Sequence, residues 1–198
     1  MSGLGNASLT NNVTLGGSVT VNGSDSLTLA GVVDGSGPLV KTGASTLTLN
    51  GANTYTGGTT LAGGTLVVGG NTALGSGGLS VTGASTLQAG APGVALANQV
   101  NLGAALTVSG ANDLTLAGNI TGAGSLTKSG AGTLTLTGQN QYSGGTTLAG
   151  GTLIGDTHSL TGAIGTATGT SLVFNQATGD DGSFGDAISG GGSLTKNG

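Results

Sequence analysis

Apolar residues alternate with threonine in short runs along most of the chain. The first three runs are residues 13–15 (VTL), 19–21 (VTV) and 27–29 (LTL). Alternation over three to five residues predicts short β-strands with one buried face. Three strands separated by turns would make one coil, and we expect residues 32–33, 39–40 and 47–49 to form the next.

The alternation also predicts which side chains face the core. We expect Leu47 and Leu49 to point inward, and Thr46 and Thr48 to point outward. Stacked coils place equivalent strands in parallel about 4.8 Å apart, so each inward aliphatic side chain meets one above and one below. Burial of each is worth roughly 1.5 to 3 kcal/mol, whereas a single coil buries almost nothing.

A long repeat runs through this pattern. Residues 45–66 (STLTLNGANTYTGGTTLAGGTL) recur as residues 132–153 (GTLTLTGQNQYSGGTTLAGGTL), with 17 of 22 positions identical and an offset of 87 residues. Within it, successive strand-like runs end in the apolar residues Leu29, Leu49, Val68, Ala89 and Leu116. The interval between the last two of these residues is longer than the three intervals before it. These intervals predict four coils per long repeat, with an insertion around residues 91–93 in the fourth.

Composition agrees with an all-β solenoid. Glycine supplies 45 of 198 residues and only 5% are charged, while Thr and Val exceed the good helix formers other than Leu and Ala. We predict a parallel β-helix of roughly nine coils with about 19–22 residues each, forming a single solenoid over residues 1–198. Its long repeats would span about 12–98 and 99–182, with a truncated third over 183–198.

The charge and residue inventory excludes several classes of protein. A net charge of −4 with three lysines and no arginine gives no basic face for nucleic acid. The absence of cysteine removes disulfides and thiolate chemistry. No apolar run is long enough for a membrane helix, and no signal peptide pattern opens the chain. We therefore expect no membrane insertion of this segment, and any signal peptide to lie outside it.

Paired glycines mark the expected corners of the coils. A change of strand direction every few residues needs positive φ or close backbone approach, and glycine allows both. The candidate corner residues are Gly57, Gly58, Gly63 and Gly64 in the first repeat and Gly144, Gly145, Gly150 and Gly151 in the second.

A long motif connects these features: G-x-L-x-K-x-G-x-x-T-L-x-L-x-G-x-N-x-Y-x-G-G-T-T-L-x-x-G-T-L. It covers residues 37–66 and 124–153, with a truncated copy from residue 192. The motif resembles the autotransporter-associated β-strand repeat, also called the passenger-associated transport repeat. This resemblance implies a right-handed parallel β-helix in the passenger of a bacterial type V secretion protein. It also implies export through the outer membrane of a Gram-negative bacterium and display at the cell surface.

Four residues of the motif form a candidate ligand face: Tyr55, Tyr142, Lys41 and Lys128. With four coils between the copies, the equivalent residues would lie on one side of the solenoid, roughly 19 Å apart. That spacing suits a polymeric ligand. Packing of each tyrosine over a glycine corner, with each lysine screening the surface, is the alternative reading that we favour.

Other polar residues give weaker signals. His158 is the only histidine and has no G-x-S-x-G serine near it, so we expect an exposed turn residue and no enzyme activity. Asp180, Asp181 and Asp186 favour an insertion loop over a calcium site. We therefore expect no catalytic residue, no metal site and no cofactor. Outward threonines suggest an ice-binding ladder, but their irregular spacing favours simple strand propensity.

The expected function is a structural stem that supports extracellular folding, export and display of the passenger. The alternative is an adhesin or self-associating surface fibre that binds carbohydrate or sister cells. The expected partners are the neighbouring coils of the parent chain. Because the sequence stops inside a motif copy, we also expect a longer array, and end-to-end association of the isolated fragment through bare ends.

Overall fold

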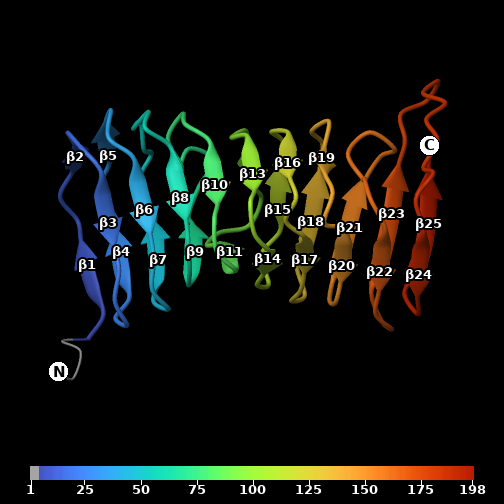
Figure 1. The fold of residues 1–198 in the computed structure, drawn as a ribbon, viewed down its shortest axis with the longest axis horizontal. Helices are drawn as coiled ribbons and strands as arrows, with labels where there is room; N and C mark the ends of the chain where they lie inside the picture. The colour runs from blue at the N-terminus through green and yellow to red at the C-terminus, as the bar shows by residue number, and fades with distance from the viewer. Residues whose placement is uncertain (1–4) are drawn as a thin grey trace.

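The chain winds into one elongated β-solenoid. A computed structural model describes residues 5–198, which form 25 strands and no helix that could span a membrane. Figure 1 shows the coils side by side along the long axis, with the described part of the chain running from one end of the rod to the other. All strand pairs among these residues are parallel, as the stacking of coils requires.

The strands lie on three faces of the rod. The first face is a ten-stranded sheet in which neighbouring strands belong to successive coils. Its strands are β1 (Ala7–Leu9), β4 (Leu27–Leu29), β7 (Thr46–Leu49), β9 (Thr65–Val68), β11 (Ser85–Ala89), β14 (Leu106–Ser109), β17 (Leu126–Lys128), β20 (Thr146–Leu148), β22 (Ile164–Thr166) and β24 (Ile188–Gly190).

The second face is interrupted. It begins with β2 (Val13–Leu15) and β5 (Val33–Gly35), which form a two-stranded sheet. It ends with six further strands: β12 (Val94–Leu96), β15 (Leu114–Leu116), β18 (Thr133–Leu136), β21 (Thr152–Gly155), β23 (Ser171–Asn175) and β25 (Ser193–Asn197). Between the two sheets, bonds from Thr54 N to Val33 O (2.9 Å) and from Ser76 N to Tyr55 O (3.0 Å) keep the coils stacked.

The third face is a seven-stranded sheet. Its strands are β3 (Val19–Val21), β6 (Leu39–Lys41), β8 (Thr59–Leu61), β10 (Leu79–Val81), β13 (Val100–Leu102), β16 (Ile120–Gly122) and β19 (Gln141–Tyr142). The ten strands of the first face give about ten turns, one more than the roughly nine predicted. The predicted β-solenoid is therefore confirmed.

The inward faces supply a core that runs the length of the rod. Leu47 and Leu49 are fully buried, whereas Thr46 and Thr48 are half-buried on the outer side, as the alternation predicts. Leu134 is equally buried, with Leu114 in the coil before it and Leu153 in the coil after it. Each aliphatic side chain therefore gains its burial from two neighbouring coils, and no coil has a core of its own.

The long repeat does not return to the same face, which corrects the expectation of four whole coils. Strand register carries Thr28 through Thr48, Val67 and Gln88 to Ser109 in four steps, which is short of the full repeat by about one strand and its turn. The remainder reaches the next face. Accordingly, β4 lies on the first face, but Leu116, the repeat equivalent of Leu29, lies in β15 on the second. One repeat is thus four coils and about a third.

The same strand register contradicts the insertion that was predicted around residues 91–93. Leu87 pairs with Val108 and Val108 pairs with Lys128, so two coils of ordinary size follow each other there. The interval from Ala89 to Leu116 is long because the two residues lie on different faces, so it spans more than one coil. A true enlargement comes later, between Ile164 and its partner Ile188, which are farther apart in sequence than any other paired residues. It directly follows the smallest coil, in which Thr146 pairs with Ile164.

Outward threonines form a ladder whose regularity the sequence hides. On the first face six of them stack in register: Thr46, Thr65, Thr86, Thr107, Thr127 and Thr147. The neighbouring column contains Thr48, Val67, Gln88 and Ser109, so the ladder is one residue wide. Along the sequence the spacing is irregular because threonines of all three faces alternate with one another.

Candidate functional site

The motif places a lysine inside the rod in each repeat. Lys41 and Lys128 are 0% and 2% exposed. Lys41 Nζ donates to Thr42 O (2.5 Å), Gly43 O (3.0 Å) and, on the next coil, Gly63 O (3.4 Å). Lys128 Nζ makes the same three bonds, to Ser129 O, Gly130 O and Gly150 O, at 2.8, 2.9 and 3.2 Å.

These carbonyl groups give each buried ammonium its polar partners. A buried charge is tolerated only where oppositely polarised groups surround it, and the corner where a strand ends supplies carbonyl oxygens free of the sheet ladder. Burial lowers the pKa of both lysines, and for Lys128 the nearby carboxylate of Asp113 partly offsets this effect.

An asparagine twelve residues after each lysine connects three coils. Asn53 Oδ1 accepts from Val33 N (2.8 Å) in the coil before, and Asn53 Nδ2 donates to Ala73 O (2.7 Å) in the coil after. Asn140 makes equivalent bonds, from Ile120 N (2.8 Å) and to Ser159 O (2.7 Å). Each asparagine side chain therefore provides a carbonyl oxygen to a backbone N–H that would otherwise be buried without a partner.

A tyrosine and a threonine complete the buried polar set. The Tyr55 hydroxyl lies 2.6 Å from Thr59 Oγ1, and the Tyr142 hydroxyl lies 2.6 Å from Thr146 Oγ1. Both tyrosines are at most 1% exposed and both threonines at most 4%. The tyrosine rings add a large buried apolar area, and the threonines satisfy their hydroxyl groups. We call Lys41, Asn53, Tyr55 and Thr59, with Lys128, Asn140, Tyr142 and Thr146, the buried polar set.

The two copies of this set coincide with the two segments that match a known family. Residues 39–68 and 126–154 each match the family described as the passenger-associated-transport-repeat. Two segments of the chain are thus similar to this family. No curated protein and no solved structure matches the chain. The resemblance seen in the motif is therefore confirmed over these two segments, and it associates the chain with autotransporter passengers.

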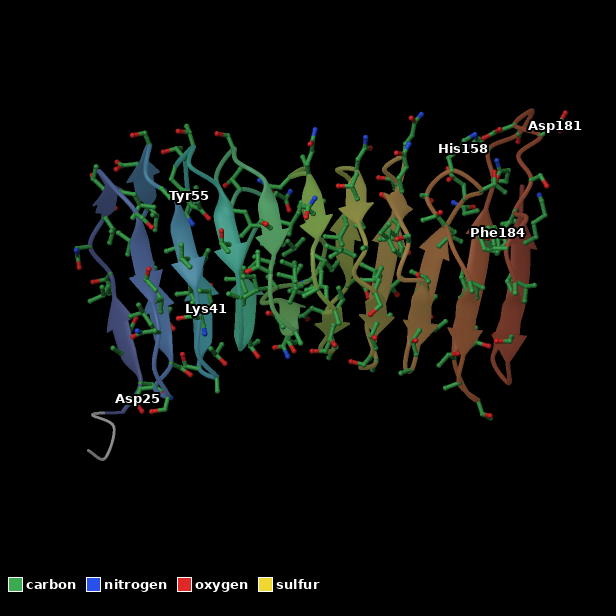
Figure 2. All side chains as sticks on the ribbon, in the orientation of Figure 1. Asp25, Lys41, Tyr55, His158, Asp181 and Phe184 are labelled. Carbon is green, nitrogen blue, oxygen red and sulfur yellow. The ribbon has the colours of Figure 1, made fainter. Side chains whose placement is uncertain are left out.

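The predicted ligand face is wrong, because its four residues are buried. Tyr55, Tyr142, Lys41 and Lys128 have no exposed surface to offer a polymer, and the lysines do not screen the outside of the rod. The two repeats also lie on different faces, since Lys41 is in β6 and Lys128 is in β17. Figure 2 marks Lys41 and Tyr55 in the first third of the rod. The lysines and asparagines that recur in both repeats thus bond one coil to the next.

The alternation of inward and outward side chains along the strands is sufficient to predict this placement. Lys41 stands two residues after Leu39, and Lys128 two residues after Leu126, so alternation puts both lysines on the inward side. The charge of the lysines favours an outward position, whereas the alternation along the strand favours an inward one. Thr59 and Thr146 were missed because most threonines of the chain face outward, and only the nearby tyrosine hydroxyl marks these two as different.

The glycine corners divide into two kinds. Gly58, Gly64, Gly145 and Gly151 have φ between +68° and +77°, the left-handed region that favours glycine. At Gly57 and Gly144 φ is not positive, but an added Cβ would lie closer than 3.0 Å to the backbone of the preceding coil. Gly63 and Gly150 lie at the corners β8–β9 and β20–β21 as predicted, but their φ is not positive. An added Cβ would approach no atom closer than 3.4 Å at Gly63 and 3.0 Å at Gly150, so the backbone requires glycine less strictly there.

His158 and the three aspartates lie near the C-terminal end of the rod. His158 is exposed in a turn, and its Nδ1 lies 3.5 Å from Asp180 Oδ2. Asp186 Oδ2 instead accepts from Gly162 N (2.8 Å). Within residues 5–198 no cluster of three metal-ligating side chains occurs. The loop that carries Asp180, Asp181 and Asp186 contains the extra residues of the enlarged coil that ends at β24.

The buried tyrosines predict a loss of stability at alkaline pH. Burial raises the pKa of Tyr55 to about 12, and hydrogen bonding to Thr59 only partly opposes this rise; burial also raises the pKa of Tyr142. The folded protein therefore holds the phenolic protons more tightly than the unfolded chain does. The tyrosine contribution to stability is complete below about pH 10 and falls by roughly 3 kcal/mol for Tyr55 as pH approaches 12.

Urea unfolding between pH 8 and pH 11.5 tests this expectation. The buried lysines act in the opposite direction, because their lowered pKa makes the folded state gain stability as pH rises toward 10.5. Tyr55→Phe and Tyr142→Phe should each flatten the alkaline decline, and the double variant should leave the rise due to the lysines. An unchanged slope in both single variants would refute the assignment.

Proposed function

We propose that the chain is a non-enzymatic stem segment of an autotransporter passenger, which supports folding outside the cell and holds other regions of the passenger away from the surface. The observation that supports this role most is the inward placement of the repeated polar residues. In both repeats the lysine and the asparagine bond to neighbouring coils, the tyrosine and threonine bond to each other, and all of them are at most 6% exposed. What the repeat preserves is therefore the contact between coils.

Contact between coils supports export because it makes folding proceed one coil at a time. Each coil contacts its neighbours and buries almost no apolar surface alone, so the chain gains stability coil by coil as it emerges. Every coil that stacks removes inward side chains such as Leu134 from water. Folding outside the membrane would therefore oppose backward movement of the exported chain.

Deletion of one repeat tests the stem role. Removing residues 29–115 rejoins Leu27-Thr28 to Leu116-Ala117-Gly118, which restores the sequence LTLAG found at residues 27–31. The alternation of inward and outward side chains is preserved, but every strand after the junction moves to a different face of the rod. The rod becomes shorter by four and a third coils, roughly 21 Å. When the chain is exported through an autotransporter translocator, we expect less protein at the cell surface, measured by protease accessibility, with no change in any enzymatic activity.

One observation favours the adhesin alternative. Under the loop between β23 and β24 lies a hollow of about 740 Å³, within the range of small-molecule sites, with Phe174 and Phe184 in its lining. The two rings meet edge to face, with centroids 5.3 Å apart, and Asp180, Asp181 and Asp186 also line the hollow. Figure 2 shows Asp181 at the outer end of this loop and Phe184 nearer the strands.

A neutral sugar with hydroxyl groups fits this combination of aromatic rings and carboxylates. In the same display experiment, unchanged surface protein together with loss of cell adhesion in Phe184→Ala would favour the adhesin over the stem. Association of the isolated chain end to end also stays a prediction. Among residues 5–198 the most exposed large apolar residues all lie in the first and last coils: Leu9, Val19, Ile188 and Leu194.

A further inference from the structure

Strand pairing in this rod has a competing arrangement that the apolar pattern does not exclude. In β15 and β18, Leu114 lies over Leu134, Thr115 over Thr135 and Leu116 over Leu136. Because side chains alternate with a period of two, a slip of two residues keeps every leucine inside and every threonine outside. The same ambiguity applies wherever leucine and threonine alternate, so hydrophobic burial alone leaves the register weakly determined.

The inward lysines are a feature that such a slip disturbs. Lys128 occupies a row in which Val108 lies in the coil before and Leu148 in the coil after, so it replaces an aliphatic residue in the core. Its Nζ reaches three carbonyl oxygens that meet at one corner, on Ser129, Gly130 and Gly150. A slip of two residues would move the lysine by roughly 6.6 Å along the strand, beyond hydrogen-bond distance of the oxygen on the next coil.

The first repeat repeats this arrangement on another face. Lys41 in β6 lies in a row with Val21 before it and Leu61 after it, and its Nζ reaches Thr42 O, Gly43 O and Gly63 O. An ammonium that loses part of this environment remains buried among aliphatic side chains, which is unfavourable. An aliphatic residue at the same position would tolerate both registers.

We propose that Lys41 and Lys128 are register keys: they select one pairing of otherwise interchangeable strands, and they do so at little or no gain in stability. A single polar residue in an apolar seam fixes the register of coiled coils in the same manner. The proposal is independent of the stem role, because it concerns how the isolated chain chooses its fold and is tested without export.

Lys128→Met tests the proposal, because methionine has a similar length and no charge. We expect the equilibrium constant of unfolding to stay within about tenfold of the parent chain or to shift toward the folded state. In the amide NMR spectrum we expect a second set of resonances for β14, β17 and β20, from a slipped register populated at about 10% or more. Lys41→Met should produce the same doubling in β3, β6 and β8.

Lys196→Met is the matched control. Lys196 occupies the same motif position in β25, where its Nζ bonds to Asn197 O (3.3 Å) and Gly198 O (2.7 Å), but the side chain is exposed and reaches no further coil. This variant should therefore give one set of resonances. A single set of resonances in both Lys41→Met and Lys128→Met would overturn the proposal. So would failure of both variants to fold, because the lysines would then be needed for stability.

Discussion

Leu134→Ala is expected to lower the free energy of unfolding by about 2 to 5 kcal/mol. Leu134 is fully buried in β18, with Leu114 in the coil before it and Leu153 in the coil after it. Truncation removes apolar contact with two coils at once, and the strand ladder prevents the backbone from closing the cavity. Chemical denaturation of the variant and the parent chain measures the loss.

Thr135→Ala provides the control for this measurement. Thr135 is the next residue on the same strand and is half-buried on the outer side, between Thr115 and Ile154. Its truncation leaves no internal cavity, so the expected loss is well under about 1 kcal/mol. Equal losses for the two variants would mean that the inward and outward faces of β18 are assigned wrongly.

Gly151→Ala is expected to cost about 2 to 5 kcal/mol, because backbone strain and overpacking add. Gly151 has φ of +68°, a conformation that is strained for alanine. In addition, an added Cβ would lie closer than 3.0 Å to Gly130 O, Gly132 O and Lys128 Nζ. Relief of this contact requires movement of the backbone or of the buried ammonium, and such overpacking costs about 1 to 3 kcal/mol.

Gly165→Ala separates these effects from a general loss of glycine. Gly165 lies in β22, its φ is not positive, and an added Cβ would meet no atom within 4 Å. Alanine should therefore be neutral or stabilise the protein by about 0.4 to 1 kcal/mol, since it restricts the unfolded chain. Thermal and urea unfolding of both variants would reveal the difference, and a similar destabilisation by Gly165→Ala would contradict the explanation.

Local pattern predicted the parts of the structure that depend on side-chain parity. The inward positions of Leu47 and Leu49 and the regular step from one coil to the next both follow from a period of two interrupted by turns. The same parity places Lys41 inside, but the energetic cost of a buried ammonium argued against that position. The carbonyl oxygens that reduce this cost come from Thr42, Gly43 and Gly63, and only the folded corner brings them together.

The relation between the repeats could not be read from their spacing. The offset between the two copies is compatible with four coils, one of them enlarged, or with four ordinary coils and a further strand. The strand register decides for the second, because Thr28 reaches Ser109 after four coils. The asparagine bonds likewise need the structure, since Asn53 finds its partners, Val33 and Ala73, one coil away in both directions.

The extra third of a coil determines how the rod meets its surroundings. Equivalent outer residues of the two repeats point in directions about a third of a turn apart, since each strand of the first repeat recurs on the next face. A flat partner, such as a neighbouring cell, can therefore touch equivalent residues of only one repeat at a time. Repetition therefore gives such a partner no multivalent contact, and it places the two buried lysines on different faces of the rod.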